Sequence, residues 1–136
     1  MNIEMRHLAH LALGALLLIA SGCVDKSNPD MVDKRSIERW NYLIAHEAEK
    51  AYDYFTPGYR ATQTREKYAA AMNNRPIQWT AASFKDKTCD GDRCIVGVNV
   101  RYSVTAPGMG GRKVESESVQ SEIWIRVDGQ WYFLPN

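Results

Sequence analysis

The spacing of apolar side chains over residues 34–55 predicts a long amphipathic helix. Apolar residues recur there every three or four positions, at Ile37, Trp40, Ile44, Ala48, Ala51 and Phe55. No glycine or proline interrupts this run before the sequence TPG at residues 56–58, where we expect the helix to stop. A second helix is expected over residues 64–72, because a threonine can cap its start and the sequence NNRP then ends it.

Beyond residue 76 the pattern changes to a period of two, which is typical of β-strands. Residues 95–104 alternate most clearly, and further strands are expected at 77–88, 119–127 and 131–134. The last two are joined by Asp128-Gly129, a strong hairpin signal. Helices followed by strands without intervening helices predict an α+β fold with a four-stranded antiparallel sheet.

The pattern of the third expected strand does not decide whether the side that carries Trp124 is buried or exposed. Four aliphatic residues occupy one side of this strand, at Val119, Ile123, Ile125 and Val127. Trp124 points to the other side, so we expect it to be partly exposed unless helices cover that side as well.

The first 22 residues have the features of a bacterial lipoprotein signal peptide. The mostly apolar run over residues 8–20 would span roughly 20 Å as a helix, which is shorter than the ~30 Å core of a bilayer. A removable signal is therefore preferred over a membrane-spanning anchor. The following sequence, IASGC at residues 19–23, resembles a lipobox and implies a lipid on Cys23; an ordinary signal peptide with a chance cysteine is the alternative.

Three parts of the chain follow from this interpretation. Residues 1–22 are the signal peptide, residues 23–33 are the lipidated cysteine and a polar tether, and residues 34–136 form a single α+β domain. Val24 follows the modified cysteine, and by resemblance to the enterobacterial sorting rule this implies an outer-membrane anchor with the domain facing the periplasm.

Cys89 and Cys94 flank the short sequence DGDR and are expected to form a disulfide across a hairpin. An oxidising compartment favours such a bridge. The alternative is half of a metal site, which would need further soft ligands. The mature chain offers only His46 for that role once Cys23 is acylated, so no metal site is expected.

The helical sequence RWNYLIAHEAEKAYDYFTPGYR at residues 39–60 and the terminal strands WIRVDGQWYFLP at residues 124–135 resemble the nuclear-transport-factor-2-like (cystatin-like cone) superfamily. The resemblance covers roughly residues 34–136. It implies N-terminal helices packed in the concave face of a curved four-stranded antiparallel sheet, which together form a cone. It also implies a break in the first helix near residues 45–47.

The same resemblance raises an enzymatic alternative. Isomerases and dehydratases of this superfamily use an aspartate base with tyrosine donors, or an aspartate–histidine pair. The residues of this chain that could take such roles are Tyr42, Tyr52, Tyr54, Tyr59, Asp53 and Glu122. However, His46 is expected at the surface, Asp53 should point away from the apolar stripe, and no nucleophile arrangement or phosphate loop is present. We therefore expect no catalytic residues and no cofactor.

The aromatic residues provide the strongest positive signal for binding. The candidate pocket or interface residues are Trp40, Tyr59, Trp79 and Trp124, although such residues most often fill a core. Residues 60–75 are locally basic, which indicates either a solvated face or a contact with anionic lipid headgroups or an acidic partner. A net charge of +1 argues against a nucleic-acid binder.

The sequence thus predicts an outer-membrane lipoprotein with a non-catalytic cone domain. Its expected partners are the membrane, through the lipid anchor, and either a small apolar ligand or another envelope protein. A pocket enzyme of isomerase or dehydratase type and a periplasmic inhibitor or immunity-type lipoprotein are the alternatives.

Overall fold

The computed structural model describes residues 28–108 and 110–136. The signal peptide and Cys23 lie outside the described residues, so lipid attachment stays a prediction. The elements follow the expected order of helices and then strands. They are α1 (Met31–Ile44), α2 (Ala48–Ala51), the 3-10 turn η1 (Tyr52–Tyr54), α3 (Pro57–Arg60), α4 (Arg65–Asn73), β1 (Ile77–Asp90), β2 (Arg93–Thr105), β3 (Lys113–Val127) and β4 (Gln130–Leu134).

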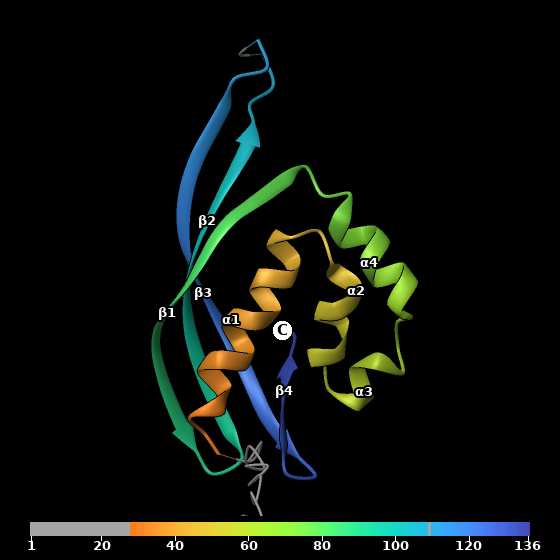
Figure 1. Cartoon of the computed structure of the whole chain (residues 1–136), viewed down its shortest axis with the longest axis vertical. Coiled ribbons are helices and arrows are strands. Elements are labelled where there is room, and N and C mark those ends of the chain that lie inside the picture. The colour runs from red at the N-terminus through yellow and green to blue at the C-terminus, as the bar shows by residue number, and fades with distance from the viewer. Residues whose placement is uncertain (1–27, 109) are drawn as a thin grey trace, which may run out of the picture.

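The four strands form one antiparallel sheet in the order β1-β2-β3-β4. The sheet curves, and the helices pack against its concave side (Figure 1). Two register shifts in the β1–β2 ladder, between Trp79 and Ala81 and between Phe84 and Asp86, add local bending. This arrangement confirms the predicted α+β fold with N-terminal helices in the concave face of a curved sheet.

The break implied for the first helix is also present. Helix α1 ends at Ile44, and α2 starts at Ala48. Between them, His46 has a φ of 58°, a left-handed conformation that no continuous α-helix can contain. The Glu47 amide donates to the Tyr42 carbonyl at 2.8 Å, which satisfies one of the free carbonyls at the helix end. His46 is exposed, as expected.

Helix α1 begins at Met31, within the segment that the sequence predicts as a tether and before the expected domain start at residue 34. A lysine of β1 fixes this early start. The Lys87 Nζ donates to Asp33 Oδ1 at 2.6 Å and to the Pro29 carbonyl at 2.9 Å. The contact joins positions more than 50 residues apart, so local sequence pattern gives no sign of it.

Strand β3 begins at Lys113, six residues before the predicted start at 119. Its first half has the sequence KVESESV, in which both faces are exposed apart from half-buried Ser118. A strand without a buried face carries little apolar alternation, and the period-two signal is therefore weak there.

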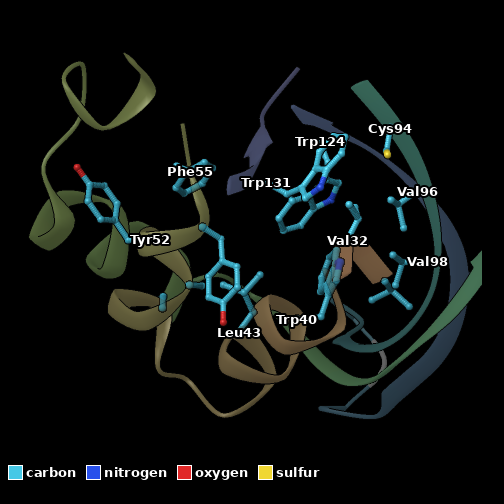
Figure 2. Packing of buried hydrophobic residues seen from close by; sticks show 14 of the residues in the cluster. Val32, Trp40, Leu43, Tyr52, Phe55, Cys94, Val96, Val98, Trp124 and Trp131 are labelled. Atoms are coloured by element: carbon cyan, nitrogen blue, oxygen red, sulfur yellow. The ribbon is translucent and has the colours of Figure 1, made fainter. Parts of the chain in front are cut away.

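The core lies between α1, the helical turns and the concave face of the sheet. Its largest fully buried side chains include Trp124 and Trp131, packed with Val32, Cys94, Val96 and Val98 (Figure 2). The sequence predicts a partly exposed Trp124 unless helices cover its side of β3; the helices do cover that side, and Trp124 is fully buried. The predicted alternation over 119–127 is correct: on the opposite face Val119 is 53% exposed, and Ile123, Ile125 and Val127 are half-buried.

The Cys89–Cys94 disulfide is formed, as predicted, between directly opposed residues of β1 and β2. Over residues 28–108 and 110–136, no helix is long and apolar enough to cross a membrane. The same residues contain no group of three histidine, cysteine or acidic side chains arranged to hold a metal ion.

Candidate functional site: a cavity in the cone

One end of the cone interior is hollow. A cavity of about 600 Å³ opens there, and its lining comes from α1, Phe55, α3, α4, the start of β1, the middle of β2 and β3, and the end of β4 with the two residues that follow it. The side chains that the following paragraphs use are Arg39, Trp40, Tyr59, Tyr68, Trp79, Tyr102, Ser118, Glu122 and Phe133. This volume lies within the usual range for small-molecule sites.

The carboxylate of Glu122 forms part of the cavity lining and is only 3% exposed. Its Oε1 accepts from Arg39 Nη2 and from Trp40 Nε1, the latter at 2.8 Å. Its Oε2 accepts from Ser36 Oγ at 2.7 Å and from Trp124 Nε1 at 2.9 Å. Each oxygen thus has two donors, which compensates the burial of the negative charge.

The Arg39 guanidinium is the cation that balances Glu122. Arg39 is 4% exposed, and its guanidinium lies over the Phe133 ring, 4.0 Å from the ring centroid. Its Nη2 donates to Glu122, whereas its buried Nε has no hydrogen-bond partner among the described residues. A buried donor without an acceptor is costly, so a ligand oxygen that reached this nitrogen would remove that cost.

Aromatic rings form much of the remaining wall. Trp40 and Trp79 meet edge to face with ring centroids 5.7 Å apart, and Phe55 and Tyr59 lie 4.4 Å apart. Tyr68 is almost fully buried, and burial raises the pKa of its phenol, while the positive charge of Arg39 offsets part of that rise. The site therefore offers flat apolar surfaces beside a few fixed polar groups.

Three of the four candidate aromatic residues line the cavity: Trp40, Tyr59 and Trp79. Trp124 does not line it. It is fully buried on the other side of Glu122 and supports that carboxylate through its indole N–H. The sequence pattern indicated Glu122 only as a possible catalytic residue, and it did not indicate Arg39 at all.

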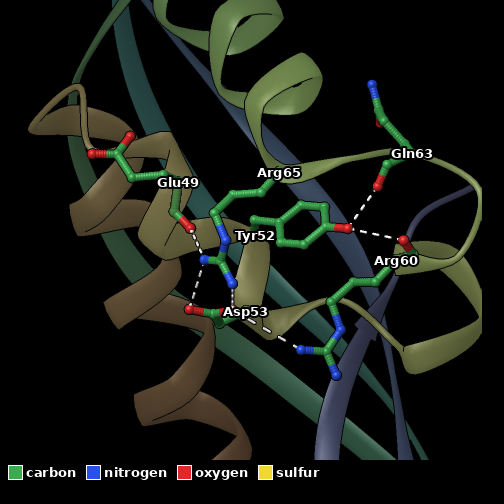
Figure 3. Close-up of polar contacts among 6 residues, drawn as sticks. All are labelled: Glu49, Tyr52, Asp53, Arg60, Gln63 and Arg65. Carbon is green, nitrogen blue, oxygen red and sulfur yellow. Dashed lines mark hydrogen bonds and ion pairs between the residues drawn. The ribbon is translucent and has the colours of Figure 1, made fainter.

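The basic segment over residues 60–75 is partly neutralised. Arg65 forms an ion pair with Asp53 at 2.6 Å and donates to the Glu49 carbonyl at 2.7 Å, and Arg60 lies 4.0 Å from Asp53 (Figure 3). The hydrogen bond from Arg65 lowers the pKa of Asp53. Two of the basic side chains thus join the helical elements to each other rather than form a free cationic surface.

The Tyr52 hydroxyl lies beside this ion pair, and its single proton is shared between the carbonyls of Arg60 and Gln63, at 2.9 and 2.6 Å (Figure 3). These contacts connect η1 with α3 and with the segment before α4. They hold α4 against the rest of the helical layer. Helix α4 contributes Tyr68 and Met72 to the cavity lining.

Comparisons with known proteins identify the fold. No family model and no curated protein matches the chain. Among solved structures, it is similar to a SEC-C-motif protein from Rhodopseudomonas palustris, with a TM-score of 0.59, 15% identity, and coverage of 81% of this chain and 77% of that one. A candidate dehydratase of the NTF2-like family from Streptomyces avermitilis gives a TM-score of 0.55 at 13% identity, over 81% of this chain and 93% of that one.

A third solved structure that resembles the chain is the CamKII hub homology domain from Chlamydomonas reinhardtii. Its TM-score is 0.50 at 18% identity, and the match covers 77% of this chain and 92% of that one. At such identities a likeness concerns the backbone, and one fold serves many functions. The arrangement of helices and sheet described above is therefore the nuclear-transport-factor-2-like cone fold.

Proposed function

We propose that the protein is a non-catalytic binding protein whose cavity takes a small, largely apolar ligand bearing one uncharged oxygen acceptor. We further propose that it acts as a lipoprotein anchored through Cys23 to the outer membrane, with its cone in the periplasm. The observation that carries the ligand proposal is the aromatic cavity of about 600 Å³ whose lining includes Arg39, an arginine whose buried Nε has no hydrogen-bond partner among the described residues.

The aromatic walls support the apolar part of the proposal. Trp79 and Tyr59 are only partly buried and pack at the margin of the core, where a flat ligand would remove their exposed ring surface from water. Burial of apolar surface contributes about 25 cal/mol for each Å². A ligand of one or two fused rings would therefore gain most of its binding free energy from these contacts.

The polar part follows from the charges around Arg39. Because Glu122 already neutralises the Arg39 guanidinium, an anion placed beside Arg39 would lose its hydration without gaining a free cation there. The other arginine of the lining, Arg75, is exposed to water, where an ion pair contributes little. An uncharged carbonyl or ether oxygen can accept from Arg39 Nε at a much lower desolvation cost. A neutral acceptor is therefore favoured over a carboxylate or a phosphate.

The geometry of Glu122 gives little support to the dehydratase or isomerase alternative. A catalytic base needs a lone pair directed at the proton that it removes. Both oxygens of Glu122 already accept two hydrogen bonds from the protein. Among the described residues that line the cavity, Glu122 is the only one with a carboxylate side chain, and none is a histidine.

Calorimetric titration with three naphthalene probes tests the proposal. We expect 2-acetylnaphthalene to bind about fivefold more tightly than naphthalene, because its carbonyl gains one hydrogen bond of about 1 kcal/mol from Arg39. The anion 2-naphthoate should bind more weakly than the ketone. Tighter binding of the anion, or no binding of any of the three, would overturn the proposed ligand class.

A matched pair of variants on β3 locates the binding site. Ser118 lines the cavity, whereas Ser116 lies two positions away on the same face of the strand and outside the lining. We expect Ser118→Trp to fill the cavity and to abolish ketone binding, and Ser116→Trp to leave the affinity unchanged. Equal effects of the two changes would place the probe elsewhere.

The anchoring proposal has a separate test. Cys23→Ser removes the thiol that would carry the lipid, so the full chain expressed in a Gram-negative host should move from the membrane fraction to the soluble periplasmic fraction. Persistent membrane attachment of this variant would refute lipid anchoring through Cys23.

A further inference from the structure

The first half of β3 forms an open edge of the sheet. Within residues 28–108 and 110–136, strand β4 pairs only with Ile123–Val127, and the preceding residues of β3 pair with β2 alone. Figure 1 shows β3 extending well past the end of β4. Over residues 113–121 every side chain is exposed except half-buried Ser118. A row of backbone groups without a neighbouring strand is a ready template for another extended chain.

The two outer edges of the sheet differ in how they are protected. Strand β1, at the opposite edge, contains two register shifts, and such irregularities discourage added strands. The ladder between β2 and β3 is unbroken from Arg93–Ile125 to Thr105–Lys113, and the open part of β3 contains no proline. The backbone of β3 is therefore regular where it is open.

The charge on this edge indicates which chain it could accept. Glu115 and Glu117 lie on the same face of β3, two positions apart, and both are exposed. Arg101 of β2 lies 3.6 Å from Glu117, and no ion pair of Glu115 is seen among the described residues. A strand added to the edge would place its alternate side chains next to these carboxylates, at the spacing at which cross-strand pairs interact.

We propose that the open edge of β3, residues 113–121, binds an extended segment of another polypeptide that carries lysine or arginine at alternate positions. Main-chain hydrogen bonds to β3 hold the segment, and its basic side chains pair with Glu115 and Glu117. Its other face, next to Val114 and Ser116, carries small or apolar side chains. This proposal does not rest on the ligand proposal, since it needs no occupied cavity, although Ser118, Gln120 and Ser121 at the end of the edge also line the cavity.

A second copy of the chain fits this edge poorly. An antiparallel pairing of two β3 strands centred on Ser116 would place Glu115 of each copy opposite Glu117 of the other. Like charges directly opposite each other destabilise a strand pair. In this register the edge therefore favours a basic partner over self-association, whereas a pairing centred on Val114 would place Lys113 of each copy opposite Glu115 of the other, so the test includes dimer formation as an outcome.

The test titrates the ¹⁵N-labelled domain with the hexapeptide acetyl-Thr-Lys-Val-Lys-Thr-Val-amide. We expect chemical-shift changes and slowed amide exchange confined to residues 113–121. The double variant Glu115→Gln, Glu117→Gln should bind about tenfold more weakly, because two exposed ion pairs are lost. Both changes are at exposed positions, and an unchanged spectrum elsewhere verifies that the variant is folded.

A peptide with N-methylated amides on its binding edge separates strand addition from charge attraction. It keeps both lysines but cannot donate main-chain hydrogen bonds, so binding should be lost. Equal binding of the two peptides, shifts centred away from residues 113–121, or concentration-dependent dimer formation through this edge would each overturn the proposal.

Discussion

The two ends of the cone interior use the same kinds of residue to different effect. At the filled end, Trp124 and Trp131 are completely buried and pack with aliphatic residues and Cys94 (Figure 2). At the hollow end, Trp79 and Tyr59 remain partly exposed around a cavity of about 600 Å³. A tryptophan in this fold can thus serve as core or as pocket wall, and its surroundings decide which.

Glu122 and Arg39 mark the boundary between the two ends. Trp124 donates to Glu122 from the filled end, and Trp40 donates from the hollow end. A carboxylate with four donors holds both indoles in place, so the ring at the cavity wall is fixed before any ligand arrives. Such preorganisation lowers the entropy cost of binding.

The largest expected effect distinguishes the two ends directly. Trp124→Ala should destabilise the domain by about 4 kcal/mol, because it leaves a void in a packed core. Trp79→Ala at the hollow end should cost only about 1 kcal/mol, mainly through the lost edge-to-face contact with Trp40. Urea denaturation measures both values, and equal losses would mean that the two ends are packed alike.

The boundary pair gives the next largest effect. Glu122→Gln should destabilise the domain by about 3 kcal/mol, because it leaves the buried Arg39 cation without its counter-charge. Glu117→Gln on the exposed face of the same strand is the matched control and should change stability by less than about 0.5 kcal/mol. Similar unfolding midpoints for the two variants would show that the buried pair does not maintain the boundary.

The disulfide lies at the filled end, where Cys94 is completely buried and opposite Trp124 on β3. It closes a loop of about six residues, so its reduction should cost about 2 kcal/mol by the loop-entropy model. Thermal melting with and without a reductant measures the loss. Because neither cysteine lines the cavity, reduced protein that stays folded should keep its affinity for the ketone probe.

The smallest effect concerns the helical layer over the cavity. Asp53→Asn removes the ion pair with Arg65 and should cost about 0.5 kcal/mol at pH 7, since both side chains are partly exposed. The folded-state pKa of Asp53 is lowered, so this contribution is present above the unfolded pKa and is lost as the pH falls through the folded one. A difference between variant and parent that persists in strong acid would contradict this cause.

Much of the fold is visible in local patterns. The apolar stripe from Ile37 to Phe55 gives the buried side of the helices, and the alternation over 95–104 gives the buried side of β2 as far as Val100. The hairpin signal at Asp128 and Gly129 is correct, and both residues have the positive φ values, 48° and 75°, that a type I′ turn requires. These features depend on a few neighbouring residues.

The key polar residues of the site could not be predicted in this way. Arg39 and Glu122 are 83 positions apart and are buried only because each neutralises the other. Taken singly, each appears as an ordinary surface charge, since unpaired charged side chains are rarely buried. The side of β3 that faces the core depends likewise on distant elements, since helices cover the side that carries Trp124.

The most direct test of the hollow and filled ends follows the four tryptophan indole N–H signals during titration of the labelled domain with 2-acetylnaphthalene. The account predicts large shifts for Trp79 and Trp40 at the cavity, a smaller one for Trp124, which reaches it only through Glu122, and none for Trp131. Shifts of equal size in all four signals, or the largest shift at Trp131, would contradict a cavity confined to one end of the cone.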